Sequence, residues 1–585
     1  MLHIIDFEVT KYDWLCVIAS PTHKTETVIA NNPAELYDYY KQYKNEIFVG
    51  YNIRDYDQWI FKAILGGFNP YEMNEHIITK HLKGYQFSSS LRDYPLIIYD
   101  IIQLNTSLKQ LEAMQGHNIY ESDIDFRIDR KLTPAELAEM IKYCKNDAQE
   151  TMDLFLQLKA DFDVQLELIN EFKLPLASIS KTQTQLTAEI LQAQRVDYKD
   201  EFNINFPPYL DRIKKYAHIV DWFRERKSDR EFTDDEKKLL YAQKLNIDVA
   251  GVPHTFAWGG LHGALLKYSG CGYYLHIDVS QYYPSLMVGH NYFSRAVTDE
   301  GKRRYDMMRR ESIRLKAFPE LKKKRNGYKL VNNKTYGGMK DKYNPLYDPL
   351  NANNICVTGQ LALLLLIEML EPHCQLIQSN TDGLIVKLYS LDDYELIDDI
   401  CYEWEQITGV SLAFDPIITR IYQKDVNNYL FVNEDGDIES KGAYVKSLSP
   451  LDYDLPIVNK ALREYMVNGT PVATTINECD ELIDFQKIVK LSGKYDYVEC
   501  QGVKMTHKCY RVFANKDITA TGIYKVKRDK GTREKFANTP ERCFIYNGDI
   551  TDFKVSDVSK LCHVHLDRQW YIDLAEERLR QFGGN

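Results

Sequence analysis

The chain has 585 residues, of which 44% are apolar and 27% are charged, and its formal net charge is −11. Single hydrophobic cores rarely exceed about 250–300 residues, so this length predicts several domains, with the composition of a soluble globular protein. The acidic balance argues against a simple basic nucleic-acid-binding protein, although clustered cations matter more than their sum.

No membrane segment or leader is expected from the apolar runs. The first residues, MLHIIDFEVTK, carry an acid at Asp6 and no basic stretch, which does not fit a signal peptide. The longest apolar run, Leu361–Ile367, ends at Glu368 and has the length of a buried helix rather than of a membrane span.

The cysteine pattern predicts free thiols. Eleven cysteines are scattered along the chain, as in proteins of a reducing cytoplasm. Cys562, His563 and His565 have the residue types of zinc ligands, but no CxxC pair accompanies them, so we expect them to be unliganded. The predicted location is the cytoplasm, which is that of the host cell if a phage encodes the chain.

The first predicted strand carries two carboxylates. Leu2–Val9 is apolar except for polar positions that include Asp6 and Glu8, which stand two residues apart and therefore share one face of a strand. Neighbouring carboxylates repel each other, and a shared cation explains their proximity. Surface strands also carry this DxE pattern without any cation, so the motif needs support from others.

Two further motifs supply that support. VGYNIRDYD places Asn52 and Asp57 after a predicted strand, and YCKND places Tyr143 and Asp147 four residues apart, on one face of a helix. The structural alternative is that Tyr143 and Asp147 only pack and cap that helix. Four carboxylates within 150 residues can form an anionic cage for two cations about 3.5–4 Å apart, which phosphodiester hydrolysis uses.

In this order, DxE, Nx3YD and YxxxD resemble the exonuclease motifs of proofreading DNA polymerases. SLKQL, at Ser107–Leu111, resembles the segment of that family that contacts the primer strand. The resemblance implies that Asn52, Ser107 and Leu108 bind a single-stranded DNA 3′ end and that Tyr143 orients the attacking water. It implies these metal ligands and catalytic acids: Asp6, Glu8, Asp57 and Asp147.

A glycine pair precedes the central part of the chain. FAWGGLHGAL places Trp258 beside Gly259 and Gly260, and adjacent glycines allow a phosphate to approach the backbone closely. The segment resembles the YxGG loop of protein-primed family B polymerases, which implies DNA contacts, although Ala257 takes the Tyr position. A plain tight turn explains these residues as well.

The most informative stretch is Tyr273–Met287, YYLHIDVSQYYPSLM. An apolar strand ends in Asp278, and a buried carboxylate at such a place calls for a cation. The segment resembles motif A of family B DNA polymerases, DxxSLYPS. The resemblance implies that Asp278 binds both metals, that backbone amides hold the triphosphate at the helix start, and that Tyr283 excludes ribonucleotides.

A basic stretch then leads into a predicted helix. Lys302–Lys329 holds twelve Lys and Arg against three acids. Cations, an amide and an aromatic ring share one helical face, at spacings of four, four and three residues. These residues are Arg325, Lys329, Asn333 and Tyr336. A triphosphate needs such cations, and the resemblance to motif B, KxxxNSxYG, implies that this face binds the incoming nucleotide.

QSNTDGLIVKL predicts a hairpin with Asp382 at its turn. It resembles motif C, usually DTDS, with Asn380 in place of the first Asp. Asp382 matches the firmer metal ligand of the family, whereas the contribution of Asn380 stays open. A hairpin turn alone also favours Asn, Asp and Gly. Downstream, Lys441 and Tyr444 resemble the KxY segment that supports the primer terminus.

The intervals between motifs are short. Lys329 follows Asp278 by 51 residues (329 − 278), and Asp382 follows Asn333 by 49 (382 − 333). Two short antiparallel helices fit the first interval, whereas the insertions of protein-primed polymerases do not fit either. We therefore expect a compact, phage-type enzyme, only distantly similar to protein-primed family B polymerases, whose processivity needs partner proteins.

The resemblance implies an α/β and α+β multidomain fold, with a ribonuclease H-like exonuclease domain followed by a right-hand polymerase of palm, short fingers and thumb. The basic run Lys525–Lys535 suits either a thumb that grips duplex phosphates or a solvated face. The predicted domains are the exonuclease (residues 1–165), a linking region (166–250), a first palm segment (251–290), the fingers (291–337), a second palm segment (338–445) and the thumb with the C-terminal region (446–585).

The predicted function is template-directed DNA synthesis with 3′–5′ proofreading, in the replication of a phage or mobile-element genome. The expected partners are primer–template DNA, a single-stranded 3′ end, dNTPs and replisome accessory proteins, but no membrane. The expected cofactor is Mg²⁺, two ions per active site, with Mn²⁺ as a substitute. Asn380 motivates the alternative, an exonuclease whose degenerate polymerase module only binds DNA. A primer-making or RNA polymerase is disfavoured by Tyr283.

Overall fold

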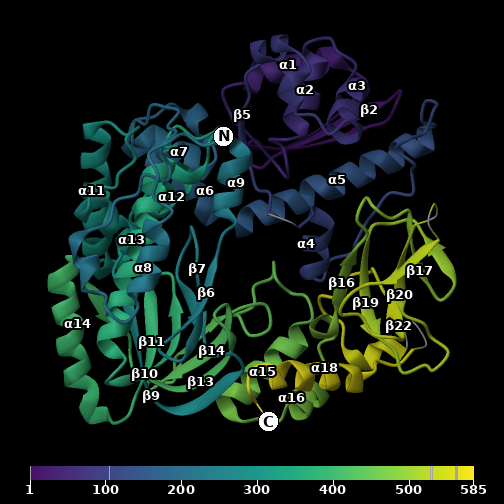
Figure 1. The fold of residues 1–585 in the computed structure, drawn as a ribbon. Helices are drawn as coiled ribbons and strands as arrows, with labels where there is room; N and C mark the ends of the chain where they lie inside the picture. Colours follow the sequence, from purple (N-terminus) through teal and green to yellow (C-terminus); the bar gives the residue numbers. More distant parts are fainter. Residues whose placement is uncertain (1, 104–105, 528, 530, 560–563, 585) are drawn as a thin grey trace. The chain divides into compact units, whose positions relative to one another are not determined.

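The protein is a mixed α/β chain that divides into two compact units (Figure 1). The computed structural model describes residues 2–103, 106–527, 529, 531–559 and 564–584, so Cys562 and His563 lie outside the described residues. Unit 1 comprises Met1–Thr182, Leu448–Pro456 and Cys479–Trp570, and unit 2 comprises Gln183–Ser447, Ile457–Glu478 and Tyr571–Asn585. The six predicted domains subdivide the chain more finely than these units, and their boundaries remain a prediction.

A five-stranded sheet organises the N-terminal part of unit 1, in the order β3-β2-β1-β4-β5. The antiparallel pairs are β1–β2 and β2–β3, whereas β1–β4 and β4–β5 are parallel. β1 has the predicted bounds, because its apolar alternation is that of a strand. The strands are β1 (Leu2–Val9), β2 (Trp14–Ser20), β3 (Thr25–Ala30), β4 (Ile47–Gly50) and β5 (Ile97–Asp100).

Helices cover both faces of this sheet. Ile5 and Phe7 of β1 pack into a core with residues of α1 and α2, whereas Leu15 and Val17 of β2 pack against α5 on the other face. The helices of this part are α1 (Pro33–Tyr43), α2 (Asp57–Leu65), α3 (Pro70–Asn74), α4 (Leu108–Met114), α5 (Pro134–Gln157) and α6 (Lys159–Glu171).

The C-terminal part of unit 1 holds two small antiparallel sheets, β16-β19-β22 and β18-β17-β20-β21. Lys525, Arg533 and Lys535 of the basic run lie on β20 and β21 and pair with Glu534, Glu499 and Glu541. Arg528 and Lys530 of the same run lie outside the described residues. The strands are β16 (Lys487–Lys490), β17 (Tyr497–Cys500), β18 (Val503–Met505), β19 (Cys509–Ala514), β20 (Ile523–Lys527), β21 (Thr532–Lys535) and β22 (Cys543–Ile545).

Unit 2 is built on a ten-stranded sheet in the order β15-β14-β13-β9-β11-β10-β8-β7-β6, with β12 paired to β9. The long strand β9 lies at its centre and carries Asp278 at its end. The strands are β6 (Leu245–Val249), β7 (Val252–Phe256), β8 (His262–Ala264), β9 (Tyr268–Val279), β10 (Cys374–Asn380), β11 (Gly383–Leu388), β12 (Leu412–Phe414), β13 (Ile418–Asp425), β14 (Asn428–Asn433) and β15 (Ile438–Lys441).

Among the residues that the structure describes, one helix, α13 (Pro349–Leu370), is long and apolar enough to span a membrane, but 89% of its most apolar stretch is buried inside the protein. This fits the prediction of a core helix, and Leu361–Ile367 is buried throughout. In the interval before Lys329, α11 and α12 pack against each other. The other helices are α7 (Gln183–Ile190), α8 (Ala217–Arg224), α9 (Asp234–Tyr241), α10 (Tyr282–Gly289), α11 (Asp299–Arg314), α12 (Lys322–Lys340), α14 (Tyr394–Thr408), α15 (Pro456–Asn468), α16 (Val472–Glu478) and α18 (Arg568–Arg580).

Candidate active sites

Strand pairing in unit 2 brings the motif A and motif C carboxylates together. β11 runs antiparallel to β9, with Gly383 opposite Asp278, so Asp382 at the β10–β11 turn lies next to the end of β9. The Val279 amide donates to the Asp382 carbonyl at 2.7 Å and fixes this register. Gly383 places no side chain between the two acids. A Cβ there would stand 3.4 Å from Asp278 Oδ1.

The electrostatics of this pair favour a cation. Burial raises the pKa of Asp278 to about 6, and repulsion from Asp382 acts in the same direction. The side chain of Asp382 stays exposed, yet the surrounding protein raises its pKa by removing water, against the lowering effect of His276 and Lys441. Two neighbouring carboxyls that resist joint ionisation fit divalent ions with oxygen ligands.

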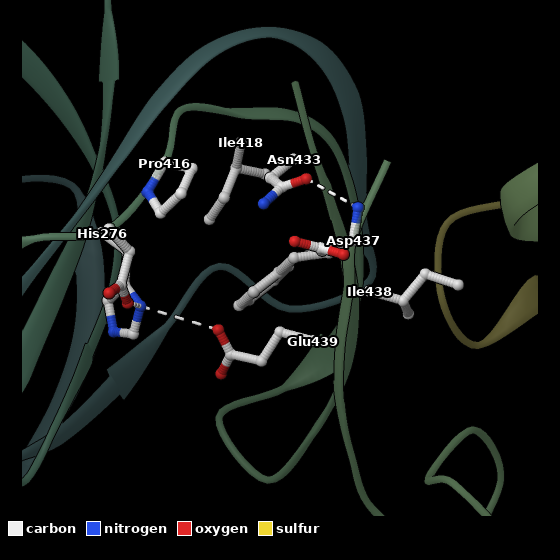
Figure 2. Close-up of a pocket in the computed structure, with 9 residues that line it drawn as sticks. His276, Pro416, Ile418, Asn433, Asp437, Ile438 and Glu439 are labelled. Atoms are coloured by element: carbon white, nitrogen blue, oxygen red, sulfur yellow. Dashed lines mark hydrogen bonds and ion pairs between the residues drawn. The ribbon is translucent and has the colours of Figure 1, made fainter. Parts of the chain in front are cut away.

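Beside His276 lies a cavity that the sequence did not predict, lined by both polar and apolar side chains. His276 stands two residues before Asp278 on β9, and its Nδ1 lies 2.9 Å from Asp415 Oδ2 and 3.6 Å from Glu439 Oε2. Figure 2 shows His276 and Glu439 facing each other across this space, which has a volume of about 190 Å³. Burial lowers the pKa of His276, but the two acids outweigh it, so the pKa is raised. No local spacing signals Asp415 or Glu439 as its partners.

The glycine pair supports the turn that carries Asp382. The Thr381 amide donates to the Leu261 carbonyl at 2.7 Å, and a Cβ on Gly260 would stand 2.5 Å from Thr381 Oγ1. The tight packing therefore requires a glycine at position 260. Gly259 has open space around its Cβ position, so its backbone stays accessible.

The Trp258 side chain is buried, which does not fit the DNA contact expected of it. The indole is buried among Phe202, Phe223 and Tyr241, and its Nε1 donates to the Leu240 carbonyl at 3.0 Å. The aromatic ring beside the glycines therefore anchors the loop in the core and is not free to stack on a base. An aromatic residue in a loop fits both roles, and only the fold distinguishes them.

Tyr283 lies in the first turn of α10, which begins after Gln281 in a left-handed backbone conformation (φ 48°). The amide of the Gln281 side chain donates to Ser312 Oγ of α11 at 2.7 Å and holds this turn. The rings of Tyr283 and Tyr336 are 4.5 Å apart, so the motif A tyrosine and the motif B tyrosine form one surface. Sequence analysis did not identify Ser312.

The predicted functional face of α12 is open to solvent. Lys329 and Asn333 are exposed and Arg325 and Tyr336 half-buried, whereas Tyr328, Val331, Thr335 and Met339 form the buried face. Among the described residues, neither Arg325 nor Lys329 has an ion pair. Lys340 continues this face, with its Nζ 4.9 Å from the Tyr336 ring centroid and 3.2 Å from the Trp258 carbonyl. Lys340 follows Tyr336 by four residues, so the helical spacing in the sequence could have identified it as part of this face.

The predicted primer-terminus residues lie on and after the edge strand β15. Lys441 ends β15, pairs with Tyr429 of β14 in the sheet, and is half-buried. Tyr444 lies beside two cations, with its ring centroid 4.2 Å from the Arg578 guanidinium and 5.0 Å from Lys424 Nζ. Lys441 therefore sits near enough to Asp382 to lower the pKa of that acid, whereas Tyr444 forms part of a cationic cluster.

In unit 1, β1 and α5 bring three of the four predicted carboxylates together. Asp6, Glu8 and Asp147 each offer an oxygen within 4.8 Å of the others. Burial, followed by repulsion among these carboxylates, raises the pKa values of Asp6 and Glu8 well above their usual range. Cys144 precedes Asp147 by three residues on α5, and its Sγ donates to Asp6 Oδ2 at 3.1 Å. This donor set suits a hard divalent cation.

Asp57 begins α2 and binds the backbone beside this cluster. Its Oδ1 accepts from the Phe7 amide, between Asp6 and Glu8, at 3.3 Å, and burial raises its pKa to about 7. Asn52 lies in the preceding turn with φ 65°, and its backbone amide donates to Asp100 Oδ1 at 3.0 Å. Asp100, at the end of β5, thus positions the Asn52 turn, a role that sequence motifs did not indicate.

A lysine neutralises the carboxylate cluster. Lys109 Nζ donates to Asp147 Oδ1 and, at 2.8 Å, to Glu112 Oε1, and it lies 4.8 Å from the Tyr143 ring centroid. Burial raises the pKa of Glu112 to about 8. Ser107 stands just before α4, where its backbone amide and its hydroxyl both donate to Gln110 Oε1, and Leu108 is half-buried beside it. Lys109 stands inside SLKQL, yet its role was not predicted.

No protein family matches the chain, and no curated protein resembles it in sequence. Among solved structures, the chain is similar to the family B DNA polymerase from the hyperthermophilic archaeon Pyrobaculum calidifontis, at 14% sequence identity and a TM-score of 0.40. The similarity covers 99% of this chain and 77% of that chain. At this TM-score the similarity carries no argument about activity, so a function must be argued from the residues of the two sites.

Proposed function

We propose that this chain is a template-directed DNA polymerase of compact family B type that also removes nucleotides from a 3′ end. The observation that carries the proposal is the pairing of Gly383 with Asp278, which sets Asp278 of β9 beside Asp382 at the β10–β11 turn. Replication of a phage or mobile-element genome in a cytoplasm, with accessory proteins, belongs to the same proposal.

The exposed face of α12 supplies the complementary charge. Arg325 and Lys329 favour binding of the triphosphate and of the pyrophosphate that leaves. Asn333 and Tyr336 line the proposed pocket for the nascent base pair, and Tyr283, in contact with Tyr336, blocks a 2′-hydroxyl. Lys441 supports the primer strand, whereas the indole of Trp258 only anchors the glycine loop.

The proposed polymerase chemistry is a displacement at the α-phosphate. Two Mg²⁺ ions, or Mn²⁺, held by Asp278 and Asp382 would activate the primer 3′-oxygen and stabilise the leaving group. The chain itself orients the reactants, because the β9–β11 register fixes the positions of both acids and α12 fixes those of Arg325 and Lys329. His276 acts against the rise in the pKa of Asp278 and so opposes the effect of the neighbouring Asp382.

The exonuclease activity in this proposal rests on the unit 1 cluster. Asp6, Glu8 and Asp147 converge, and Asp57 lies beside them at the start of α2. Tyr143 stands one helical turn before Asp147 and would orient the attacking water. The strand order β3-β2-β1-β4-β5, with its parallel and antiparallel pairs, suits the expected ribonuclease H-like fold.

One observation favours the alternative of an exonuclease with a degenerate polymerase module. Asn380 occupies the position of the first motif C carboxylate and lies opposite His262 in the β10–β8 pairing. An amide is a weaker cation ligand than a carboxylate, so the metal site relies on two acids. In that case the protein digests single strands but incorporates no dNTP.

The test is extension of a labelled primer–template with Mg²⁺ and dNTPs. Both proteins carry Asp6→Ala and Glu8→Ala so that digestion does not hide synthesis, and one also carries Asp278→Ala. We expect the first to extend the primer and the second to lose extension. Failure of the first protein with both Mg²⁺ and Mn²⁺ would overturn the polymerase proposal and leave the exonuclease alternative, which predicts metal-dependent digestion of single strands by the unsubstituted protein.

A further inference from the structure

A cluster of nitrogen and oxygen donors lies apart from both candidate active sites. His3 is on β1, His23 is in the β2–β3 turn, and Glu46 precedes β4. Each offers one donor atom, and the three atoms lie within 4.8 Å of one another. Because side chains alternate along β1, His3 faces the α1–α2 side of the sheet and Asp6 faces the α5 side.

The donors already stand at distances that suit a tetrahedral ion. Glu46 Oε2 lies 2.8 Å from His3 Nε2 and 3.3 Å from His23 Nε2. With metal–ligand bonds of about 2.0–2.1 Å, two ligands of a tetrahedral zinc ion are about 3.3 Å apart. Only small movements of the His3 and Glu46 side chains are needed to admit the ion.

The surroundings orient the donors. Tyr39 Oη lies 2.7 Å from His3 Nδ1, which is the hydrogen bond that directs the opposite nitrogen, Nε2, toward a metal. The His3 side chain is fully buried and packs on Phe48 and Tyr43, so its ring is held in place. His23 has 29% of its side chain exposed and Glu46 16%, which leaves a path for an ion and a water.

The protonation states are consistent with a cation between these groups. Burial lowers the pKa of His3, which favours the neutral imidazole that binds metals. Burial acts to raise the pKa of Glu46, but hydrogen bonds from His3 and His23 outweigh it, so the carboxylate is ionised at neutral pH. One carboxylate oxygen therefore faces two imidazole nitrogens.

We propose that His3, His23 and Glu46 bind a Zn²⁺ ion, with a water in the fourth position, as a structural clamp of unit 1. The ion joins the start of β1 to the β2–β3 turn and to the loop before β4. Two imidazoles and one carboxylate select a borderline-soft ion such as Zn²⁺, whereas the oxygen-only cluster on the other face selects Mg²⁺ or Mn²⁺. The proposal does not depend on polymerase or exonuclease activity.

The test is metal titration of the full-length, metal-free protein in millimolar Mg²⁺, which occupies the oxygen-only sites. Co²⁺ serves as the absorbing probe and Zn²⁺ as the competitor. We expect one Co²⁺ per chain with the intense visible bands of a four-coordinate ion, which Zn²⁺ displaces. His23→Gln should weaken binding at least about tenfold, and Tyr39→Phe about 10–100-fold, as for other partners of a ligating histidine.

The matched control is His81→Gln, which alters an exposed histidine of the same unit and should titrate like the wild type. If His23→Gln titrates like the wild type, or if the wild type gives no four-coordinate spectrum, the cluster is an ion pair and the proposal fails. Should His23→Gln fail to fold by circular dichroism, zinc X-ray absorption on the wild type decides. Two imidazole ligands support the site, and a shell without them overturns it.

Discussion

The packing of Gly260 against Thr381 predicts that one added methyl group impairs the polymerase site alone. In Gly260→Ala the new Cβ would stand 2.5 Å from Thr381 Oγ1, 2.9 Å from Cγ2 and 3.1 Å from Cβ. Ordinary contact begins at 3.4 Å, so Thr381 must retreat by about 0.9 Å. Rotation of the threonine does not remove the clash, because both of its γ atoms face Gly260 and fill two of the three staggered positions, so one of them stays there in every rotamer.

The retreat moves the neighbour of Thr381, which is Asp382. Overpacking of this kind costs about 1–3 kcal/mol of stability. A displacement of about 1 Å in a catalytic group costs about 10²-fold in rate, so we expect primer extension to slow by about 10–100-fold. Digestion of a single-stranded 3′ end should not change, because Asp6, Glu8 and Asp147 lie in unit 1.

The assay is single-turnover dNTP incorporation beside single-strand digestion by the same preparation. Gly259→Ala is the matched control, since nothing lies within 4 Å of its Cβ position. Gly260→Ala combined with Thr381→Ala should recover part of the rate, because only the 3.1 Å contact remains. Equal extension rates for Gly259→Ala and Gly260→Ala would refute the link between the glycine loop and Asp382.

Three further predictions concern the ionised groups and the sugar pocket. Burial raises the pKa values of Asp6, Glu8 and Asp57 (the last to about 7). The stability that these acids give the metal-free fold is therefore fully present below about pH 4 and is lost as the pH rises through their raised pKa values, which for Asp57 means through about 7. Mg²⁺ or Mn²⁺ should therefore raise the melting temperature more at about pH 8 than at about pH 5.5, and an equal rise in differential scanning fluorimetry would contradict this. Lys109→Met leaves the two buried acids Glu112 and Asp147 without their cation, so the free energy of unfolding in denaturant without metal should fall by about 3–5 kcal/mol. Lys109→Arg is the charge-preserving control, and a loss below about 1 kcal/mol for Lys109→Met would refute the role of the ion pair. Tyr283→Val should admit ribonucleotides at least about tenfold better in primer extension while leaving digestion unchanged, and unaltered sugar selectivity would exclude Tyr283 as the barrier.

Local patterns predicted those features of the sites that lie within one element. The alternation in Leu2–Val9 indicated a strand with Asp6 and Glu8 on one face, and the four-residue spacing indicated the exposed side of α12. The hairpin around Asp382 followed from its turn residues. Each of these features depends on contacts between residues close in sequence, which periodicity records.

Contacts between distant elements could not be predicted in the same way. Lys109 and Asp147 lie on different helices, and the pairing of His276 with Asp415 depends on how β12 returns to β9. Trp258 shows the opposite failure, because an aromatic residue beside glycines suits both a ligand surface and a core. The sequence alone does not record which neighbours burial supplies.

The C-terminal segment was uninformative in sequence for a related physical reason. Most of it, Cys479–Trp570, belongs to unit 1 and joins the N-terminal part of that unit through the fully buried Arg511. The guanidinium donates to the carbonyls of Ala113, His117 and Gly548 and to Gln486 Oε1, at 2.7–3.0 Å, and burial lowers its pKa to about 10. Neutral acceptors from three separate segments satisfy this cation, so no opposite charge in the sequence marks its partners. Because Ala113 lies on α4, which also carries Lys109, residues near the end of the chain help to fix the helix that neutralises Asp147.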